Sequence, residues 1–336
     1  MTAATIKIGV IGAGSLGYHH ARLLRDVRSV SFRGFYESNA DRAGVVEREL
    51  GVRAFPTIEA LLADVDAVSI VVPTKAHFSV AKQALEAGKH VLIEKPITST
   101  IEEADELLAL AKAKGAIVQI GHIERFNRAI RAALPYVDHP LFIDSDRLAP
   151  FNPRGSDVAV VLDLMIHDID LLLTLTGAKV TSVSAVGIPV LTPSIDIANA
   201  RIGFASGAVA TITASRVSKD RMRKLRIFQR NGYLSLDLAA GTGELYRLRS
   251  DVDLASLVQS AQPLEAFVEH VTIDAPAGEP LKLELESFVA ALLGEAPVAV
   301  TGQDGREALA VALNIVLEIE RSLPAAALRT GLGLGA

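Results

Sequence analysis

A glycine-rich stretch near the start of the chain constrains the fold more than any other feature. Residues 6–25 read IKIGVIGAGSLGYHHARLLR: an apolar run, then Gly12, Gly14 and Gly17, then a helical pattern. The spacing GxGxxG between a strand and a helix is typical of dinucleotide-binding turns. The first glycine permits the tight turn, the second lets the backbone approach a pyrophosphate, and the third lets helix and strand pack closely. The alternative is a glycine-rich turn that binds nothing.

The start of the helix after this turn is expected to face the phosphates of the dinucleotide. Its free N–H groups and the positive end of its dipole form a site for anions. The predicted cofactor contacts in the turn are Gly12, Gly14, Ser15, Leu16 and Gly17.

An acidic residue at the end of the second predicted strand indicates which dinucleotide is bound. Glu37 follows Gly17 by 37 − 17 = 20 residues, the separation at which an acid accepts hydrogen bonds from the adenosine ribose. A carboxylate there repels a 2′-phosphate, so NAD is favoured over NADP. Arg33 and Arg42 are near enough in sequence to weaken this preference. The alternative is a solvated glutamate at a strand end.

Length and composition limit the class of protein. A chain of 336 residues exceeds the about 250–300 residues of a single core, so two domains are expected, at residues 1–122 and 123–330. A net charge of −5 gives no reason to expect nucleic acid or an anionic membrane as a partner. The chain has no cysteine, which excludes disulfides and thiolate chemistry. No signal peptide and no apolar run of about 20 residues is present, so the sequence predicts a cytoplasmic protein.

The first 121 residues alternate between apolar runs and helical patterns. Strands are predicted at 6–11, 30–36, 53–55, 66–72, 90–93 and 116–120, and helices between them at 39–50, 57–63, 76–87 and 101–114. Repeated strand–helix units with short connections predict a parallel, doubly wound α/β sheet, the Rossmann arrangement.

The pattern changes after Gly121. Apolar and polar residues alternate at 180–188, 197–204, 208–217, 225–229 and 233–238, which predicts an antiparallel meander. Helices are expected at 158–175, 281–293 and 306–323. The second domain is therefore predicted to be α+β, with a large, mostly antiparallel sheet.

Polar residues follow the predicted parallel strands, at the edge where open α/β sheets bind ligands. They are Pro73, Thr74, His77, Glu94, Lys95, Gln119 and His122. All of them except His122 are predicted to contact the cofactor. Lys95 and His122 are predicted to contact the substrate. Lys95 follows an apolar strand and precedes Pro96, which stiffens its backbone. A lysine there can position a substrate hydroxyl and share in its proton transfer. The alternative is a surface lysine paired with Glu94.

A second group of polar residues lies in the helix predicted at 158–175. Asp163 and His167 are four residues apart, so they share a face of an α-helix, and the apolar residues around them place the helix inside the protein. Buried polar groups need partners, and a satisfied core histidine is the plain alternative. No second histidine stands at zinc-binding spacing, so no metal is predicted.

Together these motifs resemble the Gfo/Idh/MocA oxidoreductases. The matching segments are GAGSLG at 12–17, Glu37, VPTKAHF at 72–78, EKP at 94–96 and LDLMIHDID at 162–170. The resemblance implies hydride transfer between nicotinamide and a carbon bearing a hydroxyl in a sugar or cyclitol. It also implies that Lys95, Asp163 and His167 are catalytic and bind the substrate, with His167 as general acid and base. Members usually associate through the exposed face of the C-terminal sheet, so a homodimer or homotetramer is expected.

The resemblance also narrows the substrate. GHIERFNRAIR at 121–131 looks most like bacterial members that oxidise the 3-hydroxyl of UDP-N-acetylglucosamine, and Arg125 and Arg147, with Arg128 and Arg131, offer positive charge to a diphosphate. Met165 replaces the glycine that many relatives have between the acid and the histidine, so a more regular helix is expected. An inositol or free-sugar dehydrogenase of the same family and a non-catalytic dinucleotide-binding sensor remain the alternatives.

Overall fold

The computed structural model describes residues 5–152, 158–230, 232–249, 252, 263 and 266–323. Two units emerge from the contacts between residues: unit 1 is Met1–Phe126 with Gly278–Ala310, and unit 2 is Asn127–Ala277 with Val311–Ala336. The predicted domains were residues 1–122 and residues 123–330. The structure differs because a segment near the C-terminus returns to unit 1. Residues 324–330 of the predicted second domain lie outside the described residues.

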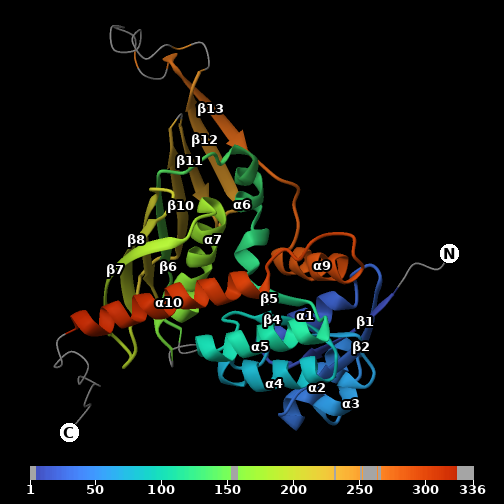
Figure 1. The fold of residues 1–336 in the computed structure, drawn as a ribbon. Coiled ribbons are helices and arrows are strands. Elements are labelled where there is room, and N and C mark those ends of the chain that lie inside the picture. Colours follow the sequence, from blue (N-terminus) through green and yellow to red (C-terminus); the bar gives the residue numbers. More distant parts are fainter. Residues whose placement is uncertain are drawn as a thin grey trace. The chain divides into compact units, whose positions relative to one another are not determined.

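Unit 1 contains a parallel sheet of five strands in the order β2-β1-β3-β4-β5 (Figure 1). The strands are β1 (Ile6–Ile11), β2 (Val30–Tyr36), β3 (Ala67–Ile70), β4 (His90–Glu94) and β5 (Val118–Gly121). The predicted strand at 53–55 is not formed. Only Ala54 bridges to Phe35 there, because a helix begins four residues later and leaves no room for a ladder. The predicted parallel, doubly wound arrangement is confirmed.

Helices flank this sheet, and the side chains that precede α2, α3 and α5 cap these three helices. They are α1 (Ser15–Leu24), α2 (Ala40–Leu50), α3 (Ile58–Leu62), α4 (Thr74–Glu86), α5 (Ile101–Lys114), the 3-10 helix η1 (Ile123–Phe126), α9 (Pro280–Leu292) and the start of α10 (Gly302–Ser322). Asn39 and Thr57 cap α2 and α3, and Thr100 with Glu103 forms a capping box on α5. Such caps satisfy N–H groups that have no partner within the helix.

Helix α9 explains why residues 278–310 belong to unit 1. Its buried side chains Leu281, Leu285 and Phe288 join the same apolar cluster as Ile8 and Val10 of β1. Phe288 is 1% exposed, and burying one such side chain stabilises a fold by about 1.5–3 kcal/mol. The helix is therefore part of the core of unit 1.

Unit 2 is built on a sheet of eight strands in the order β13-β12-β11-β10-β6-β9-β8-β7. The strands are β6 (Phe142–Leu148), β7 (Val180–Ile188), β8 (Ile197–Phe204), β9 (Val209–Ser215), β10 (Met222–Gln229), β11 (Gly232–Asp237), β12 (Thr242–Leu248) and β13 (Val268–Ile273). The sheet is mostly antiparallel, as predicted. It is not a simple meander, because β6 inserts between β9 and β10 and runs parallel to β9.

Helices cover one face of this sheet (Figure 1). They are α6 (Arg128–Ala133), the 3-10 helix η2 (Leu134–Tyr136), the π-helical turn η3 (Val161–Met165) and α7 (Ile166–Thr176). Leu225 and Ile227 of β10 and Leu234 and Leu236 of β11 are buried on the covered face. They alternate with exposed or half-buried residues, the period-two pattern of a sheet with one buried face.

Across the described ranges, every helix is too short or too polar to span a bilayer. No group of three or more His, Asp or Glu side chains in those ranges is arranged to hold a metal ion.

Candidate active site

The glycine turn of unit 1 has space for a side chain at one of its three glycines and none at the other two. A Cβ atom built on Gly17 would lie 1.9 Å from the Gly12 carbonyl oxygen, and one on Gly12 would lie 2.5 Å from the Val71 oxygen. A Cβ on Gly14 meets nothing within 4 Å. Gly12 and Gly17 are therefore required by the fold itself. Gly14 has ordinary backbone angles and leaves room that a bound pyrophosphate fits.

Two charged side chains hold the backbone N–H and carbonyl groups of Ala13 inside this turn. Glu37 Oε2 accepts the Ala13 N–H at 2.7 Å, and Arg42 Nε donates to the Ala13 carbonyl at 2.9 Å. Arg42 also donates to Gly14 O at 3.2 Å. Arg33 instead forms a bidentate pair with Asp64, at 3.0 Å for both bonds. Glu37 thus lies beside the turn, while the guanidinium of Arg33 is paired with Asp64.

The carboxylate of Glu94 is buried at the end of β4, next to Lys95. His20 Nε2 lies 3.2 Å from Glu94 Oε1, and His20 Nδ1 lies 2.8 Å from Ser69 Oγ. Burial by itself raises the pKa of Glu94, but the nearby His20 ring, with smaller contributions from the charges of Lys95 and His77, holds that pKa below its usual value. Glu94 Oε2 accepts the Lys95 N–H at 3.3 Å. This contact fixes the backbone from which the half-buried Lys95 side chain extends.

His77 connects the ends of two neighbouring strands. Its Nδ1 lies 2.8 Å from Pro96 O and its Nε2 lies 2.9 Å from Val72 O. Burial lowers the pKa of His77 in spite of these two carbonyl groups. The neutral ring has one N–H and donates to one carbonyl at a time. The buried His77 ring therefore contacts the backbone at Pro96, the residue that follows Lys95.

The other predicted contacts of unit 1 lie in different surroundings. Thr74 is the first residue of α4 and Pro73 is its N-cap. Gln119 is fully buried and its amide donates to Glu284 O and Ser287 Oγ of α9, at 3.2 and 3.1 Å. His122 is also fully buried. Arg125 Nη1 lies 3.3 Å from Asp304 Oδ2 and 3.2 Å from Ala299 O. Ligand contacts by these residues stay predictions.

In unit 2, the segment that carries Asp163 and His167 begins as a π-helix. The Ile166 N–H reaches back to Val161 O, five residues earlier (166 − 161 = 5). The expectation of a more regular helix at Met165 is wrong, because the extra residue of the π turn lies between Val161 and Ile166. Asp163 and His167 are both half-buried. Short π turns occur frequently at functional sites.

A buried ion pair fastens this helix to the sheet. Arg147 of β6 donates to Asp168 of α7, with Nε–Oδ2 at 2.6 Å and Nη2–Oδ1 at 3.0 Å, and both side chains are at most 4% exposed. The Ser145 hydroxyl donates to Asp168 Oδ1 at 3.1 Å. Asp168 is the next residue after His167, so this pair anchors the helix that carries the histidine. The Nε and Nη2 groups of Arg147 are both engaged in this pair.

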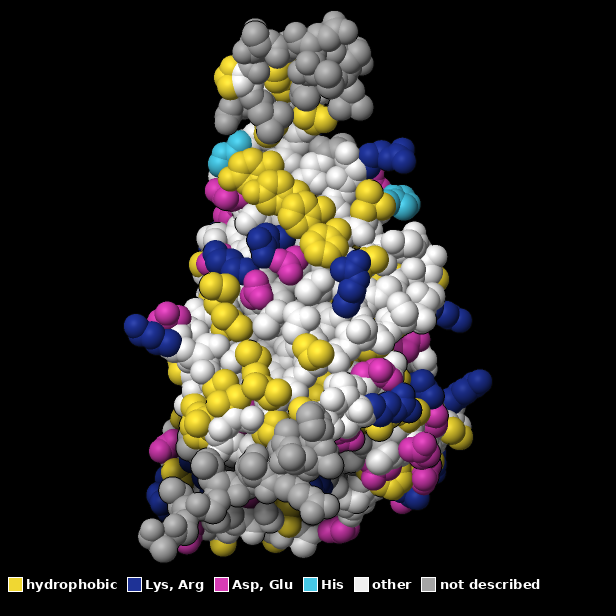
Figure 2. All heavy atoms as spheres, turned by 90° about the vertical axis from the view of Figure 1, so that its left-hand side faces the viewer, with side chains coloured by type: hydrophobic (Ala, Val, Ile, Leu, Met, Phe, Trp, Pro, Cys, Tyr) yellow, Lys and Arg dark blue, Asp and Glu magenta, His cyan; other side chains and the backbone are white. Residues whose placement is uncertain are grey.

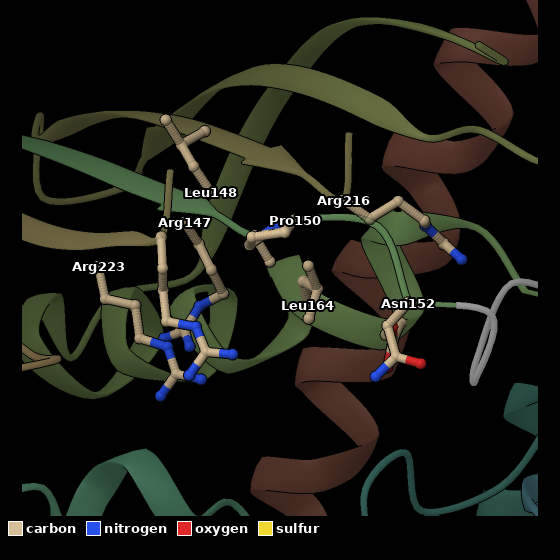
Figure 3. Close-up of a pocket in the computed structure, with 10 residues that line it drawn as sticks. Arg147, Leu148, Pro150, Asn152, Leu164, Arg216 and Arg223 are labelled. Carbon is tan, nitrogen blue, oxygen red and sulfur yellow. The ribbon is translucent and has the colours of Figure 1, made fainter. Parts of the chain in front are cut away.

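A cavity of about 190 Å³ lies beside the π turn, between β6, β10 and the segment after β9 (Figure 3). Its lining consists of Arg147, Leu148, Ala149, Pro150, Asn152, Asp163, Leu164, Arg216, Arg221 and Arg223. Asp163 is the one predicted catalytic residue in the lining. The cavity therefore combines the carboxylate of Asp163 with several guanidinium groups.

Two matches to protein-family models agree with this geometry. Residues 6–122 match an oxidoreductase family with an NAD-binding Rossmann fold, and residues 119–235 match the GFO/IDH/MocA C-terminal domain. The chain belongs to the Gfo/Idh/MocA oxidoreductase family.

Several members of the Gfo/Idh/MocA family are similar along much of the chain. A UDP-N-acetylglucosamine 3-dehydrogenase of Acidithiobacillus ferrooxidans is 40% identical over 319 residues, which is 95% of this chain and 98% of that protein. A scyllo-inositol 2-dehydrogenase (NAD(+)) of Bacillus subtilis is 32% identical over 232 residues, 63% of this chain and 68% of that protein. The solved structure of the A. ferrooxidans enzyme, GnnA, matches with a TM-score of 0.86, at 40% identity over 94% of this chain and 98% of that chain.

Membership in the Gfo/Idh/MocA family confirms the predicted fold, the oxidoreductase class and NAD as the cofactor. The room at Gly14 and the position of Glu37 fit a bound dinucleotide. His20, Asp168, Arg216, Arg221 and Arg223 were not predicted as site residues from the sequence. Asp168 was within the matched motif and Arg147 was predicted as a contact for a diphosphate, but their pairing had no detectable signal because strand β6 was not predicted.

Proposed function

We propose that this protein is an NAD-dependent dehydrogenase that oxidises the 3-hydroxyl of UDP-N-acetylglucosamine. The observation that carries the choice of substrate is the 40% identity to the A. ferrooxidans enzyme across 98% of that enzyme. That match includes both units, whereas the B. subtilis inositol dehydrogenase covers 63% of the chain at 32% identity. The arginine-lined cavity beside Asp163 is consistent with an anionic substrate.

The proposed chemistry divides between a few side chains. Oxidation of a secondary alcohol to a ketone releases a hydride from carbon and a proton from oxygen. NAD, when bound, supplies the acceptor for the hydride. His167 takes the hydroxyl proton as general base, and Asp163 and Lys95 hold the substrate through its hydroxyl groups. The buried Arg147–Asp168 pair keeps His167 in place, and the His20–Glu94 contact does the same for Lys95.

A substrate panel tests the proposal. Purified protein is incubated with NAD and with UDP-N-acetylglucosamine, myo-inositol, scyllo-inositol or free hexoses, and NADH is read by its absorbance. UDP-N-acetylglucosamine is expected to be oxidised fastest. Single-turnover conditions are included, so that tightly held NADH does not hide the reaction. Oxidation of a cyclitol or hexose without any oxidation of the nucleotide sugar supports the inositol or free-sugar alternative. No oxidation of any compound supports the sensor alternative.

The uncovered face of the eight-stranded sheet supports self-association. Five rings from five successive strands lie opposite one another in register and stack at centroid distances of 4.5–5.7 Å: Phe142, Phe228, Tyr233, Tyr246 and His270. Figure 2 shows a continuous row of hydrophobic side chains on this face. We infer that a second copy of this chain covers the row, because rows of apolar surface are usually buried in interfaces.

Sedimentation velocity tests the association. The unmodified protein is expected to be a homodimer or homotetramer at micromolar concentration, and Tyr233→Glu is expected to shift it toward the monomer. Leu317→Glu, at a site 49% exposed on α10 outside the row, is the control and should leave the oligomer intact. A monomeric unmodified protein contradicts the inference.

A further inference from the structure

A second cavity lies in unit 1, beside the edge strand β2 of the parallel sheet. It has a volume of about 330 Å³, which is within the range of small-molecule sites. The lining comes from the end of α1, the middle of β2 and the segment after α2. It consists of Arg25, Phe32, Arg33, Gly34, Gly51, Val52 and Arg53. Of these seven described residues, three are arginines and none is acidic.

The backbone of β2 is irregular where it borders this cavity. Ile8 of β1 pairs with Phe32, and the next residue, Gly9, pairs with Gly34. Arg33 is therefore an extra residue in the ladder, and such a bulge changes the direction of the side chains around it. In a regular strand Phe32 and Arg33 would project to opposite faces, whereas here both line the same cavity.

A glycine brings a further arginine to the bulge. Gly34 has a φ of +131°, and a Cβ atom built on it would lie 2.2 Å from Arg53 O. The Phe35 N–H donates to that same oxygen at 3.0 Å. A residue with a side chain does not allow so close an approach in this conformation. Gly34 therefore places the backbone of Arg53 directly against the bulged strand.

The three guanidinium groups of the cavity differ in what they contact. Arg33 forms its bidentate pair with Asp64, which is outside the lining. Arg25 donates to a backbone carbonyl, and the guanidinium of Arg53 lies 4.1 Å from the centroid of the Phe55 ring. Within the part of the chain that the structure describes, neither Arg25 nor Arg53 has a carboxylate at ion-pair distance. A bound anion would supply that partner.

We propose that this cavity binds a phosphate group, either as inorganic phosphate or on a small organic phosphate. The forked guanidinium matches the oxygens of a phosphate in a bidentate manner. Arg25 and Arg53 come from different segments that meet at the cavity, so one phosphate can accept from both. Phe32 and Val52 are half-buried in the same lining and offer apolar surface to an organic group.

This site is separate from the dinucleotide turn. Arg33 is in the middle of β2, whereas Glu37 follows the carboxyl end of that strand, four residues later (37 − 33 = 4). At the rise of a β-strand these two positions are roughly 13 Å apart. The glycine turn at residues 12–17 contributes nothing to the lining of the cavity as the structure describes it. The inference therefore goes beyond the proposed function and does not depend on it.

Calorimetric titrations of the whole protein with inorganic phosphate and with phenyl phosphate test the assignment. Saturating NAD is present throughout, so that the glycine turn is occupied. Arg53→Gln and Arg25→Gln are each expected to raise the Kd about tenfold, because a hydrogen bond between charged groups is lost. Arg53→Lys keeps the charge but loses the fork, so its Kd should be intermediate. Thermal melts confirm that each variant is folded.

The matched control is Arg28→Gln. Arg28 is an exposed arginine three residues after Arg25 but outside the lining, so its removal should change the Kd little. Tighter binding of phenyl phosphate than of inorganic phosphate assigns the site to an organic phosphate, because the ring gains contact with Phe32. Equal affinities assign it to the phosphate group alone.

Three results would overturn the proposal. They are no binding of either probe, an unchanged Kd in both Arg53→Gln and Arg25→Gln, and a loss of affinity in Arg28→Gln as large as in Arg53→Gln. The last result would show attraction by the overall charge rather than a site. Turnover is not part of this measurement, so its outcome leaves the proposed dehydrogenase activity untouched.

Discussion

Unit 1 and unit 2 carry their candidate site residues on different kinds of structure. In unit 1 the residues at the dinucleotide turn come from neighbouring parts of the sequence: the glycine turn at residues 12–17 and Glu37 at the end of the next strand. In unit 2 the lining of the cavity comes from four elements: β6, the π turn, the segment after β9 and the start of β10. The glycine turn of unit 1 offers backbone groups and open space, whereas the cavity of unit 2 is lined by several charged side chains.

This difference predicts different sensitivities. A backbone site fails when a side chain is added, because the added atoms occupy the space of the ligand or of another peptide. A side-chain site fails when one member of a buried pair is removed, because its partner is left charged and unpaired. The following predictions test each half of this contrast.

The largest effect is expected from the proposed general base of unit 2. His167→Ala should lower kcat by about 10²–10⁴-fold, the usual contribution of general acid–base catalysis, while NAD affinity stays nearly constant. Steady-state kinetics and NAD titration measure the two quantities. His139→Ala is the control, because its side chain is 96% exposed. Near-normal turnover in His167→Ala removes this residue from the mechanism.

Breaking the buried pair of unit 2 should cost almost as much, but in stability. Asp168→Ala leaves Arg147 buried without its acid, which is expected to lower the free energy of unfolding by about 3–5 kcal/mol. Urea denaturation measures the loss. The double variant Arg147→Met with Asp168→Leu should recover much of it, since neither charge remains. For comparison, Glu269→Ala breaks the exposed pair with Arg247 and should lower the free energy of unfolding far less, because water and salt screen exposed ion pairs.

In unit 1 an added methyl group should separate binding from folding. Gly14→Ala has open space around its Cβ and should keep the melting temperature, while NAD affinity falls about tenfold or more because overpacking costs about 1–3 kcal/mol. Gly17→Ala places its Cβ 1.9 Å from Gly12 O and should destabilise the fold instead. Equal NAD affinity in Gly14→Ala and the unmodified protein argues against a pyrophosphate at this turn.

The charge of Glu37 should set the choice between NAD and NADP. Glu37→Gln keeps an oxygen for the Ala13 N–H but removes the negative charge, so it is expected to narrow the preference for NAD by about 1–3 kcal/mol, or roughly ten- to a hundredfold. Titration of both cofactors measures this. Equal affinities for NAD and NADP in the unmodified protein contradict the prediction.

The smallest effect concerns pH and His77. Burial lowers the pKa of His77 in the folded protein, so the unfolded chain takes up the proton first as the pH falls. Its contribution to stability is full above about pH 6.5, the ordinary pKa of histidine, and is lost as the pH falls below that value. Unfolding free energies at pH 8 and pH 5 should differ less in His77→Gln. An identical pH dependence in both proteins rules out His77 as a cause.

The sequence by itself determined the nucleotide-binding half. The glycine spacing, the acid at 37 and the alternation of strands and helices are local patterns, and local patterns are set by the periodicity of the chain. The family motif likewise located Asp163 and His167. Strand β7 was predicted with the bounds that the structure has, Val180–Ile188, because its alternating pattern is long and bounded by turn residues.

Only the tertiary structure decided which residues are partners. Arg147 contacts Asp168 across 21 residues of sequence, and His20 contacts Ser69 across 49. Arg223 comes opposite Arg147 because β6 inserts between β9 and β10. The return of α9 to unit 1 is likewise a long-range packing event. No local pattern encodes such pairings, because each depends on where distant strands and helices come together, and a charged residue in sequence looks the same whether its partner is water or a buried acid.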